Sequence, residues 1–108
     1  MKEISIINII DVPKGMEDKA IEAREIYVDY FRKQKGFVSS TFYKSVNENH
    51  KEKYINIVVW DSYDSYTDVV NIGFDNADGI NSDNMKVLGS GFPEPIGVSP
   101  SQYEIIGN

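Results

Sequence analysis

Residues 54–72 read YINIVVWDSYDSYTDVVNI, and the hydrophobic period of this stretch changes halfway along it. Its first part, 54–60, is dominated by β-branched and aromatic side chains, which is typical of a strand. Asp61 or Ser62 can then cap a helix that runs to about Ile72. We therefore predict a strand followed directly by a helix, whose buried side chains are Tyr66, Val69 and Val70.

A strand and a longer helix are expected at the start of the chain. Residues 4–12 are rich in isoleucine and predict a strand, which Pro13-Lys14-Gly15 ends with a turn. Residues 16–35 adopt a helical period, and Gly36 is a natural helix stop. The apolar positions that share one face of this predicted helix are Met16, Ala20, Ala23, Tyr27, Tyr30 and Phe31.

Three further segments complete the prediction. Residues 37–46 form a second strand, joined to the third by the polar hairpin loop 47–52. Residues 73–100 are rich in Gly, Pro, Asn, Asp and Ser, which favours a long loop or lid with a short helix near 82–88. Residues 102–106 make the last strand.

The order β-α-β-β-α-β is that of the α+β ferredoxin-like fold, with an antiparallel four-stranded sheet covered by two helices on one face. In the strands 4–12 and 54–60, however, both faces are apolar. An exposed sheet of isoleucines would be a large apolar patch. We therefore expect a homodimer that packs sheet against sheet; the alternative is a monomer whose second face is covered by residues 73–100.

Composition narrows the chemistry of this 108-residue chain, which we expect to be a single domain. There is no cysteine, and the one histidine, His50, lies in the polar loop and is expected to be solvated. We therefore expect no metal site. A net charge of −6 makes nucleic acid and anionic membranes poor partners, and we expect a cytoplasmic protein.

Two asparagines interrupt apolar strand faces. Asn8 lies between Ile6 and Ile10, and Asn56 lies on the same face as Trp60. A buried amide without a partner costs about 1–3 kcal/mol, so each needs a hydrogen-bonding role. They either satisfy a loop backbone or line a cavity between the sheet and the helices.

Three short motifs carry a resemblance to a known family. They are Pro13-x-Gly15 before a helix, Gly-Phe-Val-Ser-Ser-Thr at 36–41, and Val-Trp-Asp-Ser-Tyr at 59–63. Together they make most of residues 4–72 similar to the antibiotic biosynthesis monooxygenase superfamily of dimeric α/β barrels. The motifs do not distinguish between the activities within that superfamily.

The resemblance implies a monooxygenase without metal or flavin, which oxidises a small aromatic or quinol-type substrate with O2. It implies catalytic roles for Asn56, Trp60 and Tyr66, whose spacing matches the anthrone-oxidising branch. The implied substrate-binding residues are Asn8, Tyr27 and Lys86. Lys86 is the nearest basic residue to a position where that branch has an arginine, since the chain has no arginine after Arg32.

Two other functions stay open. A dimeric barrel of this type can bind a ligand or a partner without catalysis. The haem-degrading relatives resemble this chain through Asn8 and Trp60, but they require a histidine on the second helix. Residues 62–88 contain none.

Overall fold

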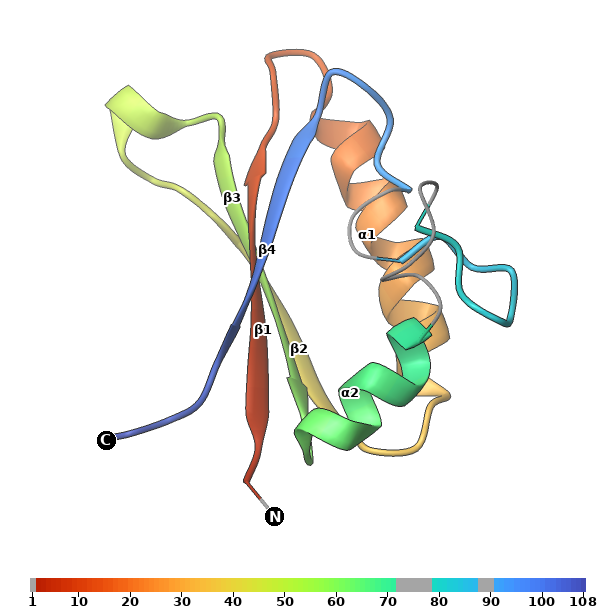
Figure 1. Ribbon diagram of the computed structural model, residues 1–108. Helices are drawn as coiled ribbons and strands as arrows, with labels where there is room; N and C mark the ends of the chain where they lie inside the picture. The colour runs from red at the N-terminus through yellow and green to blue at the C-terminus, as the bar shows by residue number, and fades with distance from the viewer. Residues whose placement is uncertain (1, 72–78, 88–90) are drawn as a thin grey trace.

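The computed structural model describes residues 2–71, 79–87 and 91–108 of the chain. It has a four-stranded antiparallel sheet with two helices on one face, which confirms the predicted ferredoxin-like order (Figure 1). The elements are β1 (Ile4–Asp11), α1 (Glu17–Arg32), β2 (Phe37–Lys44), the 3₁₀ turn η1 (Glu48–His50), β3 (Lys53–Trp60), α2 (Tyr63–Val70) and β4 (Gly97–Tyr103).

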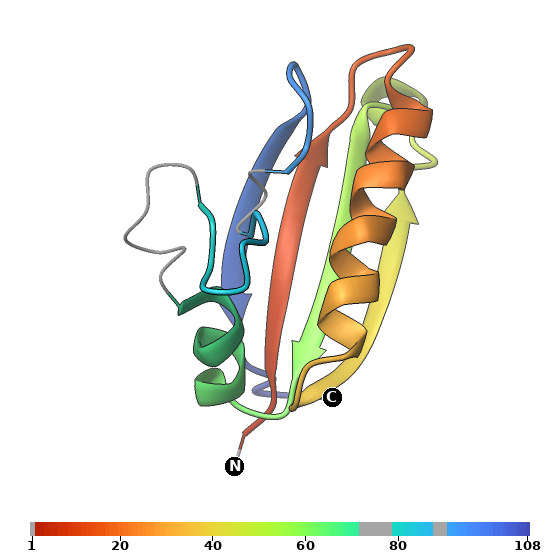
Figure 2. The same ribbon diagram turned by 90° about the vertical axis from the view of Figure 1, so that its right-hand side faces the viewer.

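The sheet order is β2-β3-β1-β4, so the two most apolar strands occupy its centre. Figure 2 shows α1 lying along this sheet, while α2 covers one end of it. Asn8 of β1 pairs directly with Asn56 of β3, and Ile6 pairs with Val58. Since alternate side chains share a face, these four residues all point toward the helices.

Two apolar clusters fill the space between sheet and helices. One surrounds Trp60 and takes in Tyr66 and Val70 of α2; the other surrounds Ile10 and takes in Ala20 of α1. Removing this much apolar surface from water is the main force that holds the helices on the sheet. The space between the two clusters is where the polar residues of β1 and β3 lie.

The buried face of α1 differs from the predicted stripe. Its buried side chains are Ala20, Ala23, Arg24, Tyr27 and Val28. Tyr30, which we placed on the core face, is half-buried: its ring packs against the Trp60 cluster, while its hydroxyl hydrogen-bonds outward to Asp83 at 2.7 Å. The helix therefore presents a guanidinium to the interior, because Arg24 follows Ala23 on the same face.

The prediction of the last strand was wrong in its position. β4 spans Gly97–Tyr103 rather than 102–106, so residues 97–100 belong to the sheet and not to a loop. Its sequence is poor in strand-forming residues, but pairing with β1 overrides that propensity. Pro100 is tolerated because β4 is an edge strand, whose outer backbone amides need no partner.

The expected short helix near 82–88 is also absent from the part that the structure describes. Residues 79–87 form a turn closed by a bridge between Ile80 and Lys86. The side chain of Asn81 holds this turn, since its Oδ1 accepts from the backbone amides of Asp83 and Met85, both at 3.0 Å. Residues 72–78 and 88–90, which the predicted helices and loop included, lie outside the described residues.

The second face of the sheet carries apolar side chains that no described segment covers. Ile9 is 44% exposed and Ile55 is 37% exposed at the centre of this face. The described parts of 73–96 lie on the helix side of the sheet (Figure 1) and do not cover them. Among the described helices, none is long and apolar enough to cross a membrane.

Candidate functional site

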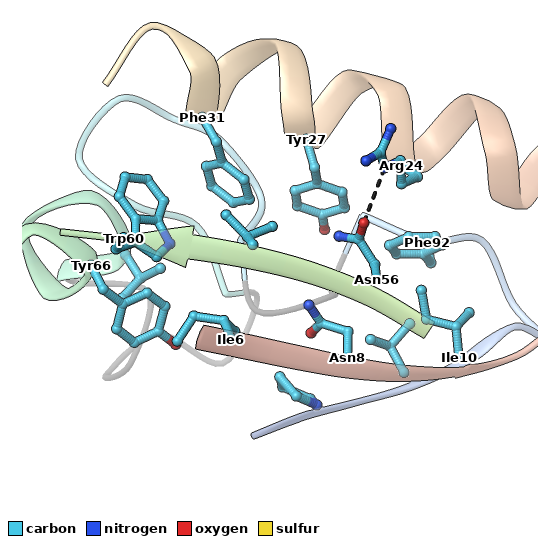
Figure 3. A pocket seen from close by; sticks show the side chains of 14 residues that line it. Ile6, Asn8, Ile10, Arg24, Tyr27, Phe31, Asn56, Trp60, Tyr66 and Phe92 are labelled. Atoms are coloured by element: carbon cyan, nitrogen blue, oxygen red, sulfur yellow. Dashed lines mark hydrogen bonds between the residues drawn. The ribbon is translucent and has the colours of Figure 1, made fainter. Parts of the chain in front are cut away.

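A small cavity lies between the sheet and α1, closed at one end by α2 and on one side by the chain around Phe92 (Figure 3). Its volume is about 40 Å³. That is room for a few water molecules, well below the roughly 300–1,000 Å³ of common ligand pockets. Its wall is mostly aliphatic and aromatic, and its polar or ionisable side chains are Asn8, Arg24, Tyr27, Asn56 and Tyr66.

The two strand asparagines meet in the cavity wall. Asn56 is 6% exposed, and its Oδ1 accepts a hydrogen bond of 3.0 Å from Nε of Arg24. The side-chain amide of Asn8 makes no hydrogen bond to any other described residue. Neither amide satisfies a loop backbone in the described structure, so the cavity-lining alternative is the one that agrees with it.

Arg24 is the functional-site candidate that the sequence analysis missed. It is 7% exposed, and beyond Asn56 its Nη2 donates to Ser40 Oγ at 2.7 Å while Nη1 pairs with Glu25 at 2.9 Å. Cζ of the guanidinium lies over the Phe42 ring, 5.3 Å from its centre. A signal was present in the sequence, because Ala20, Ala23, Arg24 and Tyr27 follow a helical spacing.

Aromatic rings form the other walls. Trp60 is 1% exposed and meets Phe31 edge-on, with ring centres 5.6 Å apart. Tyr27 stacks on Phe92 with ring centres 5.5 Å apart, and its hydroxyl accepts a hydrogen bond from the backbone amide of Gly91. Tyr27 therefore ties α1 to the segment that closes the cavity.

Tyr66 reaches the cavity from α2, where it is 3% exposed. Burial raises the pKa of its phenol, although the hydrogen bond from Gln102 Nε2, at 3.5 Å, acts in the opposite direction. The group is therefore protonated at neutral pH. It can donate a proton, but it is a poor base.

Five of the six predicted site residues come together at this cavity, namely Asn8, Tyr27, Asn56, Trp60 and Tyr66. Lys86 does not. It is exposed and borders a separate groove between α1 and the 79–87 turn. The cation at the cavity comes from the first helix, through Arg24, and not from the later part of the chain.

Among the described residues, no group of three or more acidic or histidine side chains could hold a metal ion. His50 is exposed in η1, as we expected for a solvated loop residue, and it does not line the cavity.

Comparison with known proteins gives no match to any family model and none to a curated protein by sequence. Solved structures do match. A protein from Shewanella loihica, provisionally named a monooxygenase, is 23% identical with a TM-score of 0.71, over 99% of this chain and 97% of that one. SnoaB, a cofactor-independent oxygenase from Streptomyces nogalater, is 15% identical with a TM-score of 0.75, over 100% and 97%.

These similarities establish the fold. Proteins named for antibiotic biosynthesis monooxygenases also share it, so the resemblance carried by the sequence motifs is confirmed at the level of architecture. The similarity does not extend to a particular activity, since identities stay at or below 23% in these structures.

A haem-degrading protein from Mycobacterium tuberculosis shares the fold as well, at 15% identity and a TM-score of 0.65, over 99% of this chain and 94% of that one. The residues of this chain do not fit a haem. No histidine lines the cavity, and a volume of about 40 Å³ is far too small for the macrocycle. The only histidine of the chain is His50, on the wrong element.

Proposed function

We propose that this protein is a cofactor-independent monooxygenase that oxidises a small aromatic substrate of the phenol or quinol type with O2. The observation that carries the proposal is the buried hydrogen bond between Arg24 and Asn56 in an aromatic cavity. A fixed cation and amide donors in a water-poor site stabilise a developing oxyanion. The fold is shared with an oxygenase that is described as cofactor-independent, which supports the same function.

The chemistry needs no external reductant. Loss of a proton turns the substrate into an electron-rich phenolate or carbanion that reduces O2 itself. For an activated methylene group, CH2 and O2 give C=O and H2O, so both hydrogens and all four electrons come from the substrate. The task of the protein is to hold the ring and to stabilise its anion.

We assign roles to the cavity residues on this basis. Asn56 donates to the substrate oxygen, with Asn8 as a second amide on the neighbouring strand. Trp60 and Tyr27 form the walls that hold the ring. Tyr66 donates a proton to reduced oxygen, since the raised pKa of its phenol keeps it protonated.

The cavity volume favours a second candidate, a barrel that binds a small ligand without catalysis. A substrate ring needs more than about 40 Å³, so side chains of the cavity wall must move before it can bind. A protein that holds only a very small ligand would not require this movement.

Oxygen uptake separates the two candidates. Purified protein is mixed with a panel of anthrones and hydroquinones, and O2 consumption is followed with an electrode in the presence and absence of a chelator. We expect uptake that survives the chelator and falls about 10²-fold or more in Trp60→Phe or Asn56→Ala. Asn49→Ala, in the exposed η1 turn, is the matched control.

The outcomes are distinct. No uptake with any member of the panel would reject the monooxygenase, and ligand binding without turnover would then support the second candidate. Uptake that is lost with the chelator would reject independence of metals.

We also propose that the protein is a homodimer that packs sheet against sheet. The support is the uncovered apolar face, centred on Ile9 and Ile55. A second copy is the economical cover, because the same face is then buried on both partners.

A further inference from the structure

We propose that Arg24 is a positioning residue that turns Asn56 into a hydrogen-bond donor toward the cavity, and that the site thereby selects a ligand with an anionic oxygen, a phenolate or an enolate. The inference rests on the proposed function for the aromatic nature of the ligand. It concerns binding, so it can be tested without turnover.

The direction of the Asn56 amide follows from the chemistry of arginine. A guanidinium has five N–H donors and no acceptor, so the amide must turn its oxygen toward Arg24. The 3.0 Å bond from Nε to Oδ1 has this geometry. The N–H₂ end of Asn56 then points away from Arg24 and toward the cavity, as Figure 3 shows.

Arg24 is itself held from other sides. Its Nη2 donates to Ser40 on β2 at 2.7 Å, and its Nη1 pairs with Glu25 at 2.9 Å. With three nitrogens bound and only 7% of the residue exposed, the guanidinium has little freedom to rotate. The amide of Asn56 is therefore fixed before any ligand binds, which reduces the entropy lost on binding.

The second strand asparagine extends this donor set. Asn8 lies directly opposite Asn56 in the β1–β3 ladder, where the Cβ atoms of paired residues are about 4.5–5.5 Å apart. The side-chain amide of Asn8 makes no hydrogen bond to another described residue. Two amide groups on neighbouring strands can thus donate to one ligand oxygen.

The charges around the cavity favour an anion. The titratable groups in its wall are Arg24, Tyr27 and Tyr66, and the residues from β1, β3 and β4 are uncharged. No carboxylate belongs to the wall, since Glu25 reaches only the outer nitrogen of Arg24 and its side chain is half-exposed. A phenol that binds with its oxygen beside the amide donor of Asn56 and the charge of Arg24 should lose its proton more readily than in water, because these contacts favour the anion. Their effect must exceed the desolvation that raises the pKa of the Tyr66 phenol in the same wall.

The test uses 4-nitrophenol, whose phenolate absorbs visible light while the neutral phenol does not. We expect the wild-type protein to bind it with an apparent pKa about one unit below that of the free compound. Arg24→Gln supplies an N–H donor without the positive charge, and should weaken nitrophenolate binding about tenfold and abolish the pKa shift. Arg32→Gln, on the exposed end of the same helix, is the matched control and should change neither.

Arg24→Lys separates geometry from charge. Its ammonium keeps the positive charge but lacks the rigid fork whose separate nitrogens bind Asn56 and Ser40, so we expect part of the pKa shift with weaker binding. If Arg24→Gln does not fold, Arg24→Lys and Ser40→Ala provide the test, each with an expected loss of nitrophenolate affinity.

Unchanged affinity and unchanged pKa in these variants would overturn the proposal, as would a wild-type protein that prefers the neutral phenol or binds neither form. Binding with the expected shift but without O2 uptake would reject the monooxygenase and leave the role of Arg24 standing.

Discussion

At the scale of single residues, Tyr66 links the site to the pH dependence of folding. Burial raises the pKa of its phenol above the ordinary value of 10.0. A group whose pKa is higher in the folded state stabilises the fold fully below its unfolded pKa, and that contribution is lost as pH rises through the folded pKa. The free energy of unfolding should therefore fall as pH rises above about 10.

Tyr66→Phe removes this ionisation, so the variant should lose less stability than the wild type over the same alkaline range. Urea unfolding at several pH values between about 8 and 11 measures the difference. Tyr63→Phe is the control, because Tyr63 lies on the same helix and is 50% exposed. An equal effect of both substitutions would contradict the assignment to burial of Tyr66.

Gly36 is a second residue whose surroundings lead to a prediction. It has a φ of +92°, and an added Cβ would overlap the side chain of Ser65 and lie 2.8 Å from Asp61 Oδ1. Gly15 has a similar φ of +93° but no atom within 4 Å of an added Cβ. Alanine substitutions at these two glycines therefore distinguish the cost of backbone strain from the cost of steric overlap.

Gly15→Ala should lower the free energy of unfolding by about 1 kcal/mol, from backbone strain alone. Gly36→Ala should cost about 2–4 kcal/mol, because the overlap with Ser65 adds to the same strain. Chemical denaturation of the two variants and the wild type gives both values. If the two variants were equally destabilised, the close packing of Gly36 against Ser65 at the start of α2 would not be a constraint on the fold.

At the scale of elements, the segments with a clear hydrophobic period were predicted well, and the edge strand β4 was not. β1, β3 and α1 could be placed because their apolar residues repeat with the period of a strand or a helix. β4 could not, since Gly97–Tyr103 has few strand-forming residues and is held by its pairing with β1, a contact between distant parts of the chain.

The same reasoning explains which residues of the candidate site could be predicted from the sequence. Asn56 and Trp60 could be placed because the alternation of β3 puts them on one face. Arg24 was missed because an arginine on a helix is usually solvated, and only its contacts with Asn56 and Ser40 show why it is buried. Lys86 was chosen through the family resemblance, which could not show that the turn at 79–87 keeps it outside the cavity.

The start of α2 gives an element-scale prediction. Ser62 is its N-cap, and the Ser62 hydroxyl accepts a hydrogen bond from the backbone amide of Ser65 at 3.1 Å. Ser62→Ala leaves that amide without its acceptor and should lower the free energy of unfolding by about 1 kcal/mol. Ser39→Ala, on the exposed part of β2, should change it by less than about 0.5 kcal/mol. Equal losses, measured by urea denaturation, would contradict the capping role.

At the scale of the whole molecule, the residues that the structure describes cover the sheet on one face only. The helices and the described part of 79–96 lie on one side of the sheet (Figure 1). On the opposite face, Ile9 of β1 and Ile55 of β3 are exposed to solvent. These side chains lie on the two central strands, and the edge strands beside them carry Ser, Thr and Tyr side chains on this face. An apolar centre with a polar rim is the usual anatomy of a protein interface.

Ile55→Lys tests whether a second copy covers this face. Ile55 is 37% exposed at the centre of the sheet, so a lysine there costs the single chain little, but it would bury two unpaired charges in a symmetric dimer. We expect wild-type protein to show twice the chain mass of 12.3 kDa by light scattering at micromolar concentration, and Ile55→Lys to show the single mass with circular dichroism unchanged. Ile26→Lys, at a site on α1 that is 58% exposed, is the matched control and should remain dimeric. A wild-type mass of one chain would contradict the dimer, and a dimer that survives Ile55→Lys would place the interface on another surface.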